Sequence, residues 1–404
     1  MINKKFNLYF FSSSFVSFLL FLPFFLGSNI GSDWDSYALI GTYENYLKYQ
    51  IYIPSRPPGF PLYELIVGIL IGLSKSLLIS SEQLLLSFQF LLLLSLNYLI
   101  LKFFQKNNNS NFFIYLIIIF SPIYLISGLS LIDYFLGSLF GFLSIYIIMY
   151  SKKNKFINII VPLFLSISIT ARLSNLIFLL VVFMYLVFYN KNLSSGLTII
   201  SLTLLISSLF YLIFYQNLFS FYKISGIYNN WSDMLCLFNL TNTDHSFFDR
   251  VGRFVLKQIA FLGTLGFVLL FLSIFQLKFD IRNKYLYIFI LFVLFELSFL
   301  RLPTEEGHLL PAFIAFMLLL RENNNKIFLY IFLFVFLSNF VDLKFYEVDL
   351  EDSASDITFG LEITNGFLID DYNLRSSIAN EKLYHYKNSQ LSLYNAWSNG
   401  CPNK

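Results

Sequence analysis

The sequence has little charge and few cysteines, and it lacks the motifs by which soluble enzymes bind nucleotides. Only 13% of its 404 residues are charged, about half the share that is usual in soluble domains. The two cysteines, Cys236 and Cys401, form neither a CxxC motif nor a zinc-binding spacing. There is no Walker loop and no GxGxxG motif. These absences exclude an ordinary soluble fold and a nucleotide-binding module.

The chain also lacks a basic face and an alternating strand pattern. Its net charge is +3, and its lysines and arginines are scattered between apolar segments, so we expect no nucleic-acid partner. We find no run with the period of a half-buried strand, and we therefore expect an all-helical protein.

Apolar residues dominate instead. They make up 57% of the sequence, and aromatic residues make up 20%. Many apolar runs approach the roughly 20 residues that cross a bilayer, and in lipid such runs must be helical because no water satisfies their backbone groups. The runs lie at 7–27, 60–79, 83–101, 111–126, 131–150, 156–171, 174–190, 195–216, 255–277, 285–300, 308–320 and 326–342. The sequence thus predicts an all-α polytopic membrane protein.

Positive charge occurs at every second junction between these runs, and such junctions are expected to face the cytoplasm. The basic residues concerned are Lys102, Lys106, Lys152, Lys153, Lys155, Lys191, Lys278, Arg282, Lys284, Arg321 and Lys326. The pattern allows one crossing, not two, between 60 and 101. The run at 60–79 carries Glu64 and Lys75, so we place it, with a second helix near Tyr37–Tyr49, along the outer interface.

The predicted topology has about eleven crossings (range about ten to twelve), with the N-terminus inside and the C-terminus outside. The run at 7–27 has no A-x-A cleavage site after it, and we interpret it as an uncleaved first helix. Residues 1–343 form the membrane domain, with a first outer loop at 28–82. Residues 344–404 form a short outer tail that we expect to pack on the outer loops. Cys236 and Cys401 both fall outside, where a disulfide is one of the alternatives.

The outer junctions then hold the candidate site residues. Asp33 and Asp35 form a D-x-D at the outer end of the first helix; the pattern suits a general base, and helix capping is the alternative. Arg56 lies in SRPPGFP at 55–61, where prolines stiffen the turn that presents it. A fixed guanidinium there suits a phosphate, and a snorkelling arginine is the alternative.

Further along the chain, Asp133 and Arg172 are isolated charges at apolar junctions. Ionisable groups at membrane depth are costly and often functional, although an acid at a helix start also benefits from the helix dipole. RLPTEEGHLLP at 301–311 combines Arg301 and His308 with two glutamates. This set falls short of a metal signature, so we predict no metal ligand and leave open whether a divalent metal takes part.

The first outer loop resembles that of the GT-C glycosyltransferase superfamily, in its bacterial polyprenyl-phosphate-sugar-dependent form. There the stretch commonly reads like PDSxxY followed by R-PGYP, and here Asp35-Ser36 and Arg56-Pro57-Pro58-Gly59-Phe60-Pro61 stand at those places. Asp133 is similar to the second acidic position of the superfamily, and Arg172 to an arginine after its middle helices. GHLLP at 307–311 is similar to an RYLLP-type motif in which Gly307 replaces the arginine and His308 the tyrosine.

The resemblance implies an inverting transfer of one sugar from a polyprenyl-phosphate carrier to a hydroxyl of a lipid, glycan or protein acceptor, on the extracytoplasmic side of a bacterial plasma or inner membrane. It assigns Asp35 as the base, with Asp33 as rival or partner. Arg56 is the first choice for the phosphate, and Asp133, Arg172, Arg301 and His308 support substrate binding. No cofactor other than the optional metal is implied.

Two other functions share parts of this pattern. An O-antigen-type polymerase or ligase also uses lipid-linked donors, and the loop at 217–254 ends in the paired Arg250 and Arg253. A lipid-linked sugar transporter or flippase would be polytopic too, but it should carry charges within its helices or paired repeats. Glu296 is one of few such charges, and we find no repeat.

Overall fold

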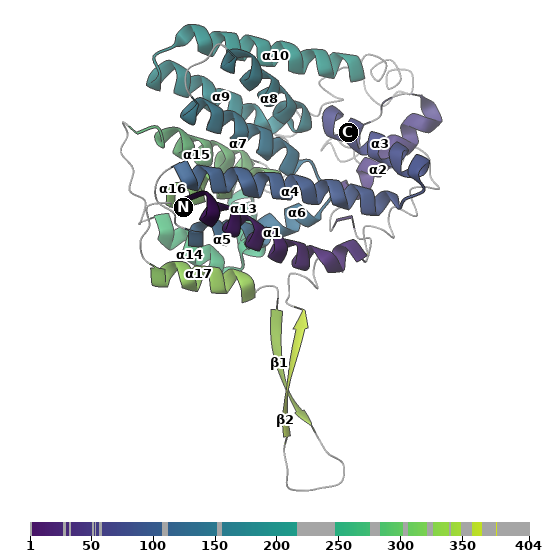
Figure 1. Cartoon of the computed structure of the whole chain (residues 1–404), viewed down its shortest axis with the longest axis vertical. Helices are drawn as coiled ribbons and strands as arrows, with labels where there is room; N and C mark the ends of the chain where they lie inside the picture. Colours follow the sequence, from purple (N-terminus) through teal and green to yellow (C-terminus); the bar gives the residue numbers. More distant parts are fainter. Residues whose placement is uncertain are drawn as a thin grey trace.

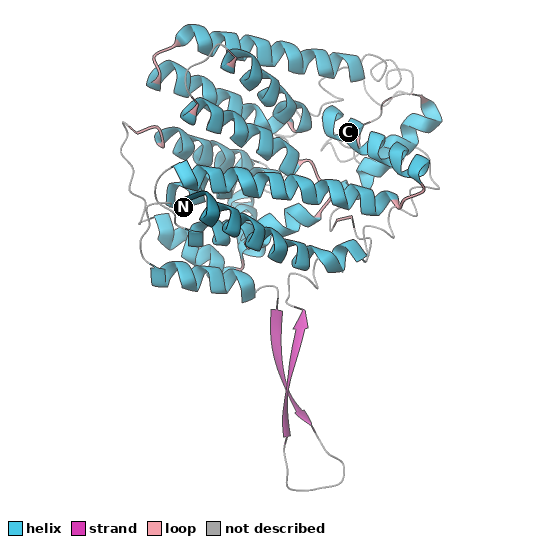
Figure 2. Cartoon of the chain, viewed as in Figure 1, coloured by secondary structure: helices cyan, strands magenta, loops and turns pink. Residues whose placement is uncertain are grey.

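The computed structural model is α-helical apart from one two-stranded hairpin (Figures 1 and 2). It describes residues 2–26, 30–31, 34–50, 52, 54–55, 59–106, 112–151, 156–215, 247–274, 283–301, 306–320, 326–338, 341–348, 358–365 and 377. The helices of the first half are α1 (Ile2–Leu26), α2 (Trp34–Tyr49), α3 (Pro61–Leu77), α4 (Ser81–Lys106), α5 (Phe112–Ile119), α6 (Pro122–Leu129), α7 (Tyr134–Tyr150), α8 (Ile157–Ala171), η1 (Leu173–Asn175), α9 (Leu176–Met184), the π-helical η2 (Tyr185–Tyr189) and α10 (Leu193–Tyr215). Those of the second half are α13 (Phe247–Leu262), α14 (Thr264–Ile274), α15 (Leu286–Arg301), α16 (Glu306–Leu319) and α17 (Lys326–Ser338).

Where the structure describes them, the apolar runs of the sequence are helical over most of their length, which confirms the α-helical prediction for the body of the protein. Two runs are divided. The run at 111–126 breaks at Ser121, whose hydroxyl caps α6 by accepting from the Tyr124 backbone N–H, with Pro122 opening the new helix. The run at 255–277 breaks at Gly263, which adopts φ 73°, a conformation that favours glycine.

Two of the described helices are long and apolar enough to cross a membrane alone. They are Ser81–Gln105 in α4 and Leu193–Phe214 in α10, and Val251–Ala260 with Thr264–Ile274 makes a third candidate if this pair, bent by 110°, counts as one span. The other apolar helices, such as α7 and α8, are shorter. About eleven crossings therefore stay a prediction from the sequence.

Two boundaries differ from the sequence prediction. Residues 247–254 were expected in a long outer loop, but they form the first turns of α13. The last run was expected to extend to 342, but α17 ends at Ser338, and the antiparallel strands β1 (Val341–Val348) and β2 (Thr358–Asn365) follow. The expectation of no strands was wrong here, because β1 alternates only in part (VDLKFYEV) and its partner follows only after nine intervening residues.

The hairpin projects away from the helices (Figure 1). The packing of the tail on the outer loops stays a prediction, because most of the tail lies outside the described residues. Register within the hairpin is regular, from Val341 opposite Asn365 to Val348 opposite Thr358. The rest of the tail, including Cys401, and the loop that holds Cys236 lie outside the described residues.

Close helix packing around α7 positions the ends of α7 and α8. The Ser168 hydroxyl on α8 donates to the Gly137 carbonyl on α7 at 2.6 Å, and the Asn175 amide donates to the Ser168 carbonyl at 3.0 Å. Gly141, one turn further along α7, faces the buried ring of Phe178 on α9, and a Cβ atom added there would overlap that ring. Small residues on α7 thus let three helices approach closely.

We expect Gly141→Ala to lower stability by about 1–3 kcal/mol, because the added methyl group overpacks a core in which Phe178 cannot move aside. Gly252→Ala is the matched control, because nothing lies within 4 Å of a Cβ atom added at that helical glycine. Thermal unfolding of both purified variants in the same detergent measures the effect. Equal midpoints for the two variants would show that the α7–α9 contact is not tight.

Candidate active site

A buried ion pair joins the start of α7 to the end of α8. Asp133 immediately precedes α7, and Arg172 immediately follows α8. Arg172 Nη1 donates to Asp133 Oδ2 at 2.9 Å, with side-chain exposures of 5% and 1%. Arg172 Nε also donates to Ser174 Oγ at 3.1 Å. The two isolated charges that the sequence singled out are therefore partners.

Aromatic rings and a glycine surround the guanidinium. Its central carbon lies 4.6 Å from the centroid of the Tyr134 ring and 5.8 Å from that of Phe60, both within the range of cation–π attraction. Gly307, in the first turn of α16, abuts the same group, and a Cβ atom there would overlap both Arg172 and Tyr134. Arg172 thus fills the space into which a larger residue at position 307 would project.

This contact limits the side chain that position 307 can hold. An arginine at position 307 would have to displace Arg172, whose own guanidinium already occupies this point between α7, α8 and α16. The cation at this place comes from the α8–η1 junction, and the α16 segment supplies a glycine that permits its approach.

A second buried carboxylate, Glu64 on α3, holds the turn that precedes its helix. It accepts hydrogen bonds from the Tyr52 hydroxyl, from the backbone N–H and hydroxyl of Ser55, and from the backbone N–H of Phe60. The last bond is 3.3 Å long and resembles the reach-back of a capping box. Desolvation raises the pKa of Glu64, and the hydrogen bonds oppose that rise. Both ends of the proline-rich turn are thereby fixed to one side chain.

The start of α2 lies beside the segment that leads to Asp133. The Leu131 backbone N–H donates to the Ile30 carbonyl at 2.6 Å, and a Cβ atom at Gly31 would lie 3.4 Å from Ser130 Cβ. Asp35 is the second residue of α2, so its backbone belongs to this end of the molecule. The structure does not describe the side chain of Asp35, and both Asp33 and Arg56 lie outside the described residues.

Arg301 and His308 lie on either side of the α15–α16 junction. Arg301 is exposed in the last turn of α15, where a cation is favoured by the helix dipole. His308 is 6% exposed, and its Nδ1 lies 3.3 Å from the Ser298 hydroxyl. His308 is therefore engaged with α15, and its neighbour Gly307 is the residue of this segment that touches the ion pair.

No family model, curated protein or solved structure matches this chain. The chemistry of the site must therefore be argued from its own residues.

The arrangement gathers charge and hydrogen-bonding groups at one end of an apolar helical body. The charges of Asp133 and Arg172 compensate each other. Either charge buried without its partner would carry a large uncompensated desolvation cost. Among the described residues, no group of three or more His, Cys, Asp or Glu side chains could hold a metal ion.

Sequence reasoning missed Glu64 as a site component and noted it only as a charge that weakens a membrane span. Its position was the available signal, since an acid in the first turn of a helix that opens with proline can reach back to the residue before that proline. Phe60 and Tyr134 were also missed as partners of Arg172. Aromatic residues are so frequent in this chain that no local pattern distinguishes these two.

We expect Asp133→Asn and Arg172→Gln each to destabilise the protein by about 3–5 kcal/mol, because each leaves one buried charge without its partner. The double variant Asp133→Leu/Arg172→Met should recover much of that loss, since it removes both charges and keeps side-chain volume. Thermal midpoints of the three variants in one detergent test this. Additive losses in the double variant would contradict a direct pairing.

Proposed function

We propose that this chain is an integral-membrane glycosyltransferase of the GT-C type. It would transfer a sugar, with inversion, from a polyprenyl-phosphate carrier to an acceptor hydroxyl on the extracytoplasmic side. The observation that carries the proposal is the convergence of four segments on one end of the protein. These are the start of α2, the turn held by Glu64, the Asp133–Arg172 pair and the first turn of α16.

The membrane location is supported by the outward face of α10. Six of its leucine and isoleucine side chains are between 50% and 63% exposed: Leu193, Leu197, Leu205, Leu209, Leu212 and Ile213. A continuous exposed apolar face on a helix of this length needs lipid around it. With the shorter apolar helices counted as spans, the proposal has about eleven crossings.

The proposed mechanism needs a base near the acceptor and a cation near the departing phosphate. Asp35 is assigned as the base that takes the acceptor proton while the hydroxyl oxygen attacks the anomeric carbon; the bond from that carbon to the lipid phosphate oxygen breaks. Asp33 is its neighbour and rival. Arg56, on the turn whose ends Glu64 holds, is the first choice for the phosphate.

The roles of the remaining residues follow from their partners. The charge of Arg172 is compensated by Asp133, so the main role of the pair is to position the surrounding segments. The Arg172 guanidinium would contact the phosphate only while it stays paired with Asp133. Arg301, at the exposed end of α15, is the further cation of the proposal, and His308 orients the α16 segment through Ser298.

The test is a transfer assay with purified protein, a panel of polyprenyl-phosphate-linked hexoses and pentoses, and membrane lipid and glycan acceptors. We expect Asp35→Asn to lower kcat by at least about a hundredfold, the scale of a lost general base, with an unchanged thermal midpoint. Glu44→Gln is the matched control, because Glu44 is an exposed carboxylate on the same helix.

Equal rates for wild-type protein and Asp35→Asn would overturn the assignment of the base. Products longer than one added sugar would favour a polymerase, and lipid-linked sugar that changes leaflet without release of polyprenyl phosphate would favour a flippase.

A further inference from the structure

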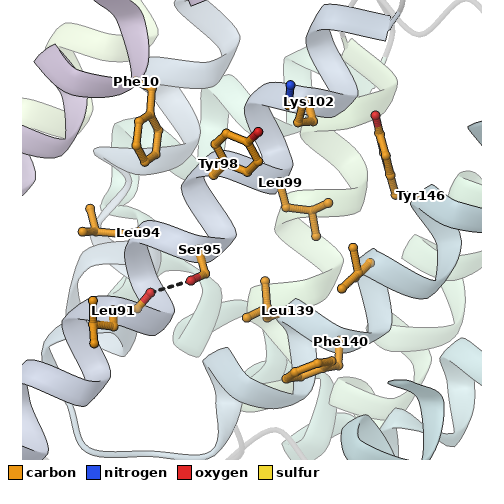
Figure 3. Close-up of a pocket in the computed structure, with 11 residues that line it drawn as sticks. Phe10, Leu91, Leu94, Ser95, Tyr98, Leu99, Lys102, Leu139, Phe140 and Tyr146 are labelled. Atoms are coloured by element: carbon orange, nitrogen blue, oxygen red, sulfur yellow. Dashed lines mark hydrogen bonds between the residues drawn. The ribbon is translucent and has the colours of Figure 1, made fainter. Parts of the chain in front are cut away.

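An apolar groove runs along α4 and α7. It extends from the middle of the helical body to the end that lies opposite Asp133. It has a volume of about 580 Å³ and is lined by Phe10, Leu91, Leu94, Ser95, Tyr98, Leu99, Lys102, Leu139, Phe140, Leu143 and Tyr146 (Figure 3). The α4 residues recur with helical spacing over eleven positions, or about 16 Å of helix. Leu91 is 60% exposed and Tyr98 44% exposed, so the groove opens outward.

One end of the groove carries a cation. The Lys102 ammonium lies 4.3 Å from the Phe6 ring centroid and 5.1 Å from that of Tyr98. It donates to Gln105 Oε1 at 3.3 Å, and no ion pair with an acidic side chain is found for it in the described part of the chain. The Tyr146 hydroxyl points toward the same end (Figure 3). The rest of the lining is apolar except for Ser95, whose hydroxyl donates to the Leu91 carbonyl.

Further tyrosines and a lysine continue this polar end around the body. The Tyr150 and Tyr285 hydroxyls lie 2.8 Å apart, and the Lys284 ammonium lies 3.9 Å from the Tyr150 ring centroid. Tyr146 packs against Tyr150 at 5.2 Å between centroids. Tyrosine and lysine together mark the headgroup level of a bilayer, so the groove descends from that level into the hydrocarbon region.

We propose that this groove binds one anionic glycerophospholipid of the bilayer, with an acyl chain along α4 and α7 and the phosphate at Lys102. The groove matches such a lipid in both parts, since its cation lies at headgroup depth and its apolar walls lie below. No acidic side chain lines it, so the ammonium group of a zwitterionic lipid has no carboxylate partner in the groove. The proposal rests on the membrane location above and not on glycosyl transfer.

The test is native mass spectrometry of the full chain, titrated with phosphatidylglycerol and with phosphatidylcholine of the same acyl chains. The wild-type protein should retain phosphatidylglycerol in preference to phosphatidylcholine. Lys102→Gln should reduce that preference about fivefold, which is the effect expected for one lysine at an anionic surface. Lys102→Arg should keep it. Lys191→Gln is the control, because Lys191 is exposed between η2 and α10 and does not line the groove.

A second variant tests the groove itself without changing charge. Ser95→Trp places an indole in the space, and it should lower the retention of both lipids while the thermal midpoint stays within a few degrees of wild type. The proposal fails if Lys102→Gln keeps the preference, if Lys191→Gln loses as much, or if Ser95→Trp binds lipid like wild type. The proposal would also be overturned, in favour of a second copy of this chain, if the wild-type protein retained no lipid and formed a dimer that Ser95→Trp dissociates.

Discussion

The ion pair between Asp133 and Arg172 is the constraint on which this end of the protein depends. Two charges that are 1% and 5% exposed persist in an apolar body only because each compensates the other. The pair joins the two helix ends that flank it, and the rings of Tyr134 and Phe60 and the backbone at Gly307 pack around the guanidinium. Four segments from distant parts of the sequence therefore meet at this one interaction.

The two ends of the helical body differ in how they carry charge. At the Asp133 end, the carboxyl groups of Asp133 and Glu64 are buried, and both accept hydrogen bonds. At the other end, Lys102 and Lys284 lie over aromatic rings, next to hydroxyls and exposed apolar side chains. The first arrangement positions segments around a site, whereas the second is typical of a protein surface at lipid headgroups. The two ends of the bundle therefore differ in their chemistry, as the proposed orientation in the membrane requires.

Much of the helical body could be predicted from the sequence, because apolar runs of this length have one structural solution in lipid. The pairing of Asp133 with Arg172 could not be predicted, since 39 residues separate them and no local pattern records the distance between α7 and α8. The role of Gly307 was equally hidden, because only the packing shows that the Arg172 guanidinium occupies the space beside this glycine. The hairpin after α17 escaped prediction because its two strands stabilise each other and neither alternates fully.

In the proposed orientation, the Asp133 end of the protein faces away from the cytoplasm and the Lys102 end faces it. Labelling of single cysteines in intact cells with a membrane-impermeant maleimide measures this most directly, in a Cys236→Ser/Cys401→Ser background. Ser80→Cys places a thiol at the exposed turn before α4, and Lys191→Cys places one at the exposed turn before α10. The account predicts that Ser80→Cys is labelled in intact cells and Lys191→Cys only after permeabilisation; the reverse pattern would contradict it.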